Sequence, residues 1–76
     1  MPYGFWFNMR RYTSEKPRAT IAELKVQANA SPGYHTYKEV DGGKDIPFGD
    51  GEAADLTGEP RFYTVPPATM YRGNSF

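Results

Sequence analysis

The sequence contains no cysteine among its 76 residues, and this absence excludes several kinds of structure and chemistry at once. A chain without thiols has no disulfide framework, no zinc–thiolate site and no cysteine nucleophile. The single histidine, His35, has no second histidine or cysteine beside it, so a metal site and a Ser-His-Asp arrangement both lack parts. The fold therefore has to be held by packing alone.

The sequence also lacks an excess of charge and a long apolar run. Nine Lys and Arg residues balance nine Asp and Glu residues, which leaves no basic surface for nucleic acid or for an anionic membrane. No stretch approaches the roughly 18 apolar residues of a membrane span. Residues 1–5 have neither the basic nor the apolar region of a signal peptide. We expect a soluble, cytoplasmic protein with no nucleic-acid and no membrane partner.

The chain is short for a catalytic protein. A domain near this size buries only about 60% of the surface of its unfolded chain, which leaves little depth for a walled cleft. Asp50, Glu52 and Asp55 lack the spacing of a calcium-binding EF-hand, so we expect a solvated acidic loop there. We therefore predict no enzyme activity, no catalytic residues, no metal and no cofactor.

Aromatic residues are plentiful, with five Phe, six Tyr and one Trp. Each can bury about 150–250 Å², so a few of them can form the core of a small domain. The run 4–8 alternates, which puts Phe5 and Phe7 on one face of a predicted strand and Trp6 on the other. A more polar second strand over 11–16 completes a predicted N-terminal hairpin.

The clearest local signal is a capping box formed by Thr20 and Glu23. The Thr20 hydroxyl can accept a hydrogen bond from the Glu23 amide while the Glu23 side chain reaches back. This predicts a helix that begins at Ile21 and ends by about Asn29, before a Ser-Pro-Gly cluster. Such a helix must lie against a sheet, because isolated helices shorter than about 12–15 residues are marginal in water.

Three further strands are predicted after the helix. The segment 34–40 repeats its apolar residues every three positions and does not fix the buried face; we favour Tyr37 inward. The segment 45–48 is predicted as a short edge strand, because its proline has no N–H to donate. Residues 49–59 are predicted to be mostly loop, and residues 61–65 are predicted to form the last strand.

This order of elements predicts an α+β protein with the β-grasp (ubiquitin-like) fold, a mixed sheet of four to five strands that wraps one helix. The first and last strands are expected to lie parallel at the centre of the sheet. Residues 1–67 would form the domain. Residues 68–76 have no periodicity and are expected to form a flexible C-terminal tail.

Four segments carry a likeness to a known family. They are Thr-x-x-Glu-Leu at 20–24, Ser-Pro-Gly-Tyr at 31–34, Glu-Val-Asp-Gly-Gly at 39–43 and Arg-Phe-Tyr-Thr-Val-Pro-Pro at 61–67. Through them, roughly residues 5–69 resemble the bacterial multiubiquitin domain, a prokaryotic ubiquitin-like β-grasp. Two departures from the family are the polar third strand, with Thr36 and Lys38, and the single unit in place of a tandem array.

The resemblance implies a function and a set of partners. Proteins of this kind accompany an activating enzyme, a conjugating enzyme and often a JAB-type metalloprotease, and some related operons are linked to antiphage defence. This chain would then be a ubiquitin-like protein modifier of a bacterial ubiquitination-like pathway, joined to target proteins by an isopeptide bond.

The segment Tyr71-Arg72-Gly73 is similar to the Arg-Gly-Gly ending of ubiquitin and is followed by Asn74. Glycine suits a carboxylate that must thread an enzyme channel, because it has no Cβ. We expect a partner metalloprotease to cut between Gly73 and Asn74, after which the Gly73 carboxylate is adenylated and passed to a cysteine of another protein. The competing explanation is that Arg72 and Gly73 are incidental residues of a tail.

The outward face of the last strand holds the second candidate site. Tyr63 and Val65, together with Trp6 on the first strand, are candidates for a protein-binding patch, because grouped surface aromatics commonly mark protein contacts. Scattered surface hydrophobicity is the competing explanation. The alternative function is a non-covalent β-grasp adaptor or protein-binding module, which needs only this face.

Overall fold

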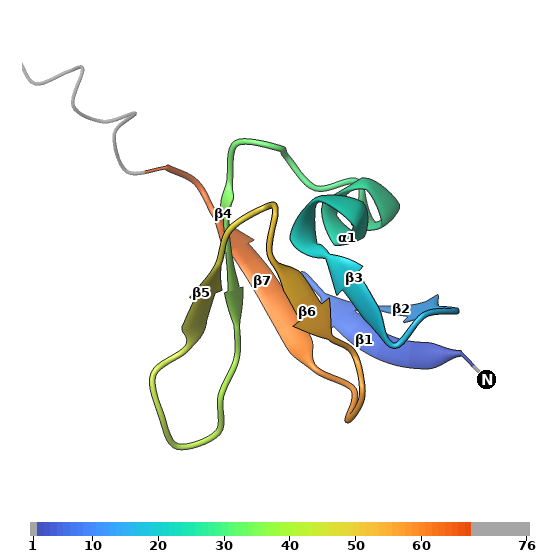
Figure 1. The fold of residues 1–76 in the computed structure, drawn as a ribbon. Coiled ribbons are helices and arrows are strands. Elements are labelled where there is room, and N and C mark those ends of the chain that lie inside the picture. The colour runs from blue at the N-terminus through green and yellow to red at the C-terminus, as the bar shows by residue number, and fades with distance from the viewer. Residues whose placement is uncertain (1, 68–76) are drawn as a thin grey trace, which may run out of the picture.

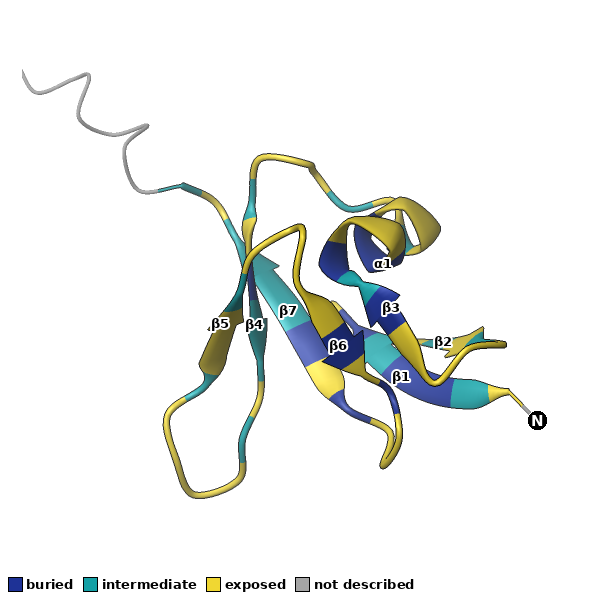
Figure 2. Cartoon of the chain, viewed as in Figure 1, coloured by how far each residue is buried: buried dark blue, intermediate teal, exposed yellow. Residues whose placement is uncertain are grey.

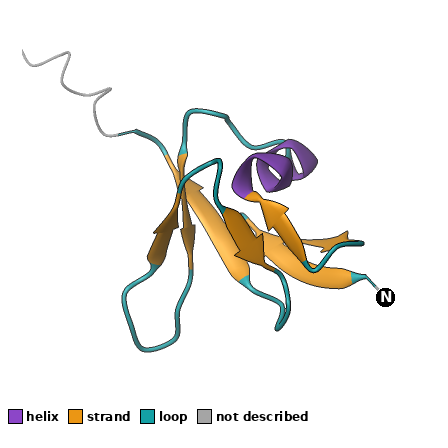
Figure 3. Cartoon of the chain, viewed as in Figure 1, coloured by secondary structure: helices purple, strands orange, loops and turns teal. Residues whose placement is uncertain are grey.

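The computed structural model describes residues 2–67. The elements follow in the order β1 (Tyr3–Phe7), β2 (Arg10–Ser14), β3 (Arg18–Thr20), α1 (Ile21–Ala28), β4 (His35–Lys38), β5 (Ile46–Phe48), β6 (Ala53–Asp55) and β7 (Arg61–Val65) (Figure 1). Five strands form one mixed sheet in the order β2-β1-β7-β4-β5, and β3 pairs with β6 separately. This is the predicted α+β architecture of the β-grasp, with the helix on one side of the main sheet (Figure 3).

The centre of the sheet is the predicted parallel pair of β1 and β7, in which Phe7 lies opposite Phe62. The other neighbours in this sheet are antiparallel. Asn8 extends the short parallel pair, because its side-chain oxygen accepts a hydrogen bond from the Thr64 N–H at 2.9 Å. The first and last strands, far apart in the sequence, therefore fix each other's register.

The N-terminal hairpin closes through a two-residue turn. Asn8 and Met9 both have positive φ, 52° and 71°, which is the backbone that matches the right-handed twist of a hairpin. The second strand ends at Ser14, earlier than the predicted Lys16. The Ser14 hydroxyl accepts a hydrogen bond from the Lys16 N–H at 3.1 Å, so the chain turns away from the sheet there.

The core lies between the sheet and the helix (Figure 2). Its fully buried aromatic rings come from β1 and β7, and the rings of Phe7 and Phe62 have centroids 6.1 Å apart. Burial of each large apolar side chain contributes about 1.5–3 kcal/mol, so this small set supplies most of the driving force. The buried hydrophobic residues are Phe5, Phe7, Ala19, Ile21, Leu24, Ala54, Leu56 and Phe62.

The expectation that Tyr37 points inward is wrong. Thr36 is the buried residue of β4, with 1% of its surface exposed, and Tyr37 lies opposite Tyr63 of β7. Because side chains alternate along a strand and Phe62 faces the core, Tyr63 and its partner Tyr37 must both face outward. The pairing with β7, which the spacing of apolar residues in β4 could not reveal, decides the face.

The sequence analysis did not predict two short strands. One is β6, within the segment 49–59 that was expected to be mostly loop, and the other is β3, directly before the helix. The short strands β3 and β6 pair antiparallel, with Ala19 opposite Ala54. Both alanines are buried. Three-residue strands show too few alternations to be recognised from sequence. The pair closes the side of the core that the main sheet leaves open.

The helix begins and ends where the capping signals predict. The Thr20 hydroxyl accepts from the Glu23 N–H at 3.2 Å, Glu23 Oε1 accepts from the Thr20 N–H at 2.9 Å, and Asn29 ends the helix with a φ of 56°. Lys25 is buried beside the apolar helix residues Ile21 and Leu24: it is only 3% exposed. Its Nζ donates to the Pro32 carbonyl, the Tyr34 carbonyl and Asp50. Within residues 2–67, no helix has the length and apolar character needed to cross a membrane.

Candidate functional site

The outer face of the five-stranded sheet, opposite the helix, is the candidate site. Strand alternation that buries Phe5, Phe7 and Phe62 turns their neighbours Trp6 and Tyr63 to this face. The face is therefore built by the same pattern that builds the core. Its aromatic and arginine side chains are of the types enriched at protein contact sites.

Five side chains form a continuous row on this face, which we name the aromatic strip: Trp6, Arg61, Tyr63, Tyr37 and Val65. Trp6 lies opposite Arg61, whose guanidinium carbon is 4.9 Å from the indole centroid. Two residues further along β7, Tyr63 stacks on Tyr37 with ring centroids 5.6 Å apart and an interplanar angle of 16°. Val65 continues the row at the end of β7. Stacking and the cation–π contact stiffen the strip.

Asp45 holds the Tyr63 ring in place. The Tyr63 hydroxyl donates to Asp45 Oδ2 at 2.5 Å, and Asp45 Oδ1 accepts from the Val40 N–H at 3.1 Å. The hydrogen bond to Asp45 raises the pKa of Tyr63 to about 12. The same bond, followed by the one from Val40, lowers the pKa of Asp45. Tyr63 is therefore uncharged near neutral pH. Its ring is oriented by Tyr37 of β4, on which it stacks, and by Asp45 in the loop before β5.

A salt bridge lies beside the strip at the β2 edge, next to Trp6. Arg11 of β2 reaches Glu59 with an N···O distance of 2.9 Å, and this contact lowers the pKa of Glu59. The guanidinium passes over Gly4, where a Cβ on the backbone would overlap Arg11 Nη2. Gly4 thus leaves room for Arg11 to lie across β1. Both side chains are about half exposed (45% and 55%), so solvent screens the pair and it adds little to stability.

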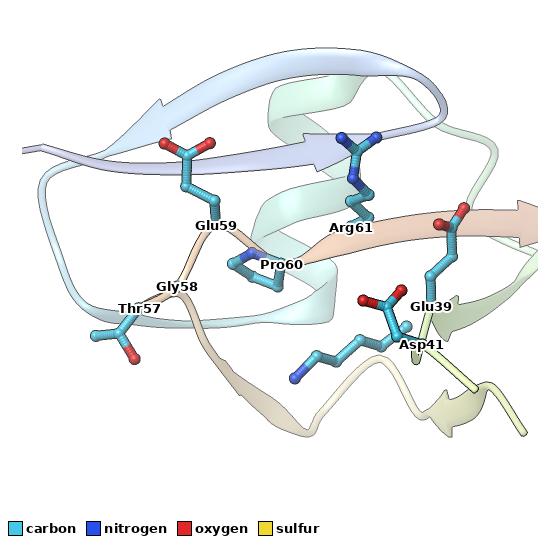
Figure 4. Close-up of a pocket in the computed structure, with 8 residues that line it drawn as sticks. Glu39, Asp41, Thr57, Gly58, Glu59, Pro60 and Arg61 are labelled. Carbon is cyan, nitrogen blue, oxygen red and sulfur yellow. The ribbon is translucent and has the colours of Figure 1, made fainter. Parts of the chain in front are cut away.

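A polar pocket of about 240 Å³ lies at one end of the sheet, between the loops that follow β4 and precede β7 (Figure 4). Three carboxylates, from Glu39, Asp41 and Glu59, share it with the cations of Lys38 and Arg61. The opposite charges largely compensate each other. Among residues 2–67, no group of three His, Cys, Asp or Glu side chains is arranged to hold a metal ion.

The predicted binding residues all face outward on this side of the sheet. Trp6, Tyr63 and Val65 are each half-buried rather than fully exposed, because their neighbours in the strip cover part of them. Val65 lies opposite the exposed His35. The predicted processing residues, Arg72, Gly73 and Asn74, lie outside the residues that the structure describes.

The predicted binding residues do not include three contributors to this face: Tyr37, Arg61 and Asp45. Alternation along β7 places Arg61 on the face of Tyr63 and Val65, so Arg61 could have been included from the sequence. Tyr37 and Asp45 depend on how β4 and its following loop pair with β7. That pairing is a long-range feature without a local signal.

Comparisons of this chain with protein-family models, with curated proteins and with solved structures found no significant match.

Proposed function

We propose that this protein is a ubiquitin-like modifier of a bacterial conjugation pathway, recognised through the aromatic strip and attached to target proteins through Gly73. The proposal is supported chiefly by the β-grasp topology, in which the last strand runs at the centre of the sheet beside β1. The chain that carries Gly73 thus follows directly from the strip, since Val65 ends both β7 and the strip.

The two parts have separate chemical tasks. The strip offers aromatic and arginine side chains on a stiff sheet, which is the composition that contributes most to binding when a partner covers it. A partner metalloprotease hydrolyses the Gly73–Asn74 bond and frees the Gly73 carboxylate, which supplies the reacting group. An activating enzyme adenylates this carboxylate with ATP and releases pyrophosphate, a cysteine of that enzyme displaces AMP to form a thioester, and a target amine then displaces the thiol. The nucleophilic sulfur belongs to the enzymes, in keeping with a chain that has no cysteine.

Conjugation is tested by expressing the full chain, tagged at its N-terminus, in the organism that encodes it. Covalent adducts that survive denaturing electrophoresis are expected, and peptide mass spectrometry should find Gly73 joined to a lysine of another protein. A version that stops at Tyr71 keeps every described residue and should form no adduct. Adducts linked through another residue, or none at all, would contradict the assignment of Gly73.

The second candidate function, a non-covalent adaptor, is favoured by the ordered strip alone. It predicts that the chain ending at Tyr71 still retains its partners under native conditions. Tyr63→Glu should abolish that retention, because it puts a charge on the strip and removes the ring that stacks on Tyr37. Val26→Glu is the matched control, since Val26 is 82% exposed on the helix. Equal retention by the two variants would exclude the strip from binding.

A further inference from the structure

The two edges of the main sheet differ in their ability to accept another strand. β5 and β2 are its outer strands. β5 carries Pro47 at its middle position, and proline cannot donate to a ladder, so this edge is blocked. β2 has no proline in its five residues. Its outer edge is therefore the one at which a further strand could add.

The backbone groups that face outward from β2 can be identified from the register. Trp6 of β1 donates its N–H to the Pro60 carbonyl on the β7 side at 2.9 Å. Its partner on β2, Arg11, consequently has no ladder hydrogen bond to β1. Because antiparallel hydrogen-bonded pairs alternate, Thr13 shares this orientation. The N–H and C=O groups of Arg11 and Thr13 thus point away from the sheet.

One of these outward groups already has a partner, which supports the assignment. The Thr13 carbonyl accepts a hydrogen bond from the Gln27 side chain of α1 at 2.9 Å. Within residues 2–67, the N–H and C=O groups of Arg11 and the N–H group of Thr13 form no backbone hydrogen bond outside the strand ladders. The edge therefore presents two donors and one acceptor in the spacing of a β-ladder.

The charge at the Arg10 end of this edge favours an acidic side chain in the partner, whereas the exposed Glu15 follows β2 at its other end. Arg10 is exposed and forms no ion pair within the part of the chain that the structure describes. Arg11 is engaged with Glu59, and Lys16 lies 3.7 Å from Glu23, a loose and exposed contact. Two copies of the chain meeting edge to edge would bring their arginine-bearing strands together. An acidic strand would instead neutralise Arg10.

We propose that the outer edge of β2 binds an extended acidic peptide segment of a partner protein by strand addition. Main-chain hydrogen bonds to Arg11 and to the Thr13 N–H supply affinity, and Arg10 selects acidic side chains. Tyr12, half-buried and stacked on Phe5 with ring centroids 5.7 Å apart, gives the added strand an apolar neighbour on the helix side. This surface is distinct from the aromatic strip and does not depend on Gly73.

The test uses the full chain labelled with ¹⁵N and a synthetic peptide of about eight residues, the length of a long strand, with valines in the middle and aspartates at both ends. Saturable shifts are expected at the Arg11 and Thr13 amides. Hydrogen exchange of both amides should slow by about tenfold or more, because a newly bonded amide must open before it exchanges. Shifts confined to Tyr63 or to β5, or no saturable shift, would refute strand addition at β2.

Charge selection has its own controls. Replacing the peptide's aspartates with lysines should weaken binding, and Arg10→Glu should weaken binding of the aspartate peptide by about three- to tenfold, the range for reversal of an exposed charge. Lys44→Glu makes the same charge change in the exposed loop before β5 and should leave the affinity unchanged. If Arg10→Glu and Lys44→Glu lost the same affinity for the aspartate peptide, the loss would come from the net charge of the protein, and Arg10 would have no specific role.

Discussion

Lys25 offers the sharpest test of how this small domain is held together. It is a buried lysine on a helix whose other buried residues are apolar, and its Nζ makes three contacts: 3.1 Å to the Pro32 carbonyl, 2.5 Å to the Tyr34 carbonyl and 2.8 Å to Asp50 Oδ1. These acceptors lie in the loop after the helix and in the loop after β5. One side chain thus ties two loops to the helix.

Lys25→Met keeps the length of the side chain and removes all three contacts. Hydrogen bonds to a charged group each contribute about 1.5–3 kcal/mol, and loss of a buried ionic partner costs about 3–5 kcal/mol. The Asp50 side chain is 52% exposed and can regain water, so we expect the lower part of this range, a loss of about 2–4 kcal/mol. A chain of 76 residues has about 4–11 kcal/mol in total. The variant should therefore lose a large share of its stability.

Urea unfolding followed by circular dichroism measures this loss. Asp50→Asn is the matched variant, because it keeps both carbonyl contacts and an acceptor near Lys25; we expect it to cost only about 1 kcal/mol. A stability for Lys25→Met within about 0.5 kcal/mol of the parent chain would refute the reasoning. An independent check is amine acetylation of the native protein, which should spare Lys25 and modify the exposed Lys16 and Lys44.

Three further outcomes follow from individual contacts. Thr20→Ala removes the helix cap and should cost about 1 kcal/mol in urea unfolding. Asp45→Asn should lower the pKa of Tyr63 from about 12 toward 10.0 in an ultraviolet titration. In the parent chain, the Tyr63–Asp45 hydrogen bond contributes its full stabilisation below pH 10.0, and this contribution is lost as the pH rises through about 12. Gly4→Ala displaces the Arg11 guanidinium and should cost no more than about 1 kcal/mol, with a smaller salt dependence of stability than in the parent chain; a larger cost would mean that the backbone moves instead.

Several elements of the fold followed from local sequence patterns. Alternation of Phe5, Trp6 and Phe7 predicted both the first strand and its buried face. The Thr20–Glu23 box predicted the helix start to the residue. These patterns are predictive because the residues that interact lie within a few positions of each other. The interactions that form the strand or the helix end can therefore be recognised in one short segment.

The order of the elements along the sequence thus predicted the α+β class and the parallel central strands, and local alternation predicted the outward direction of Trp6 and Tyr63. Tertiary structure alone decided that Tyr37 faces outward, that Asp45 binds Tyr63, and that Lys25 is buried. Each of these depends on partners 7–26 residues away or on strand pairing. The energy of such contacts exists only once the chain has folded, so no local pattern encodes them.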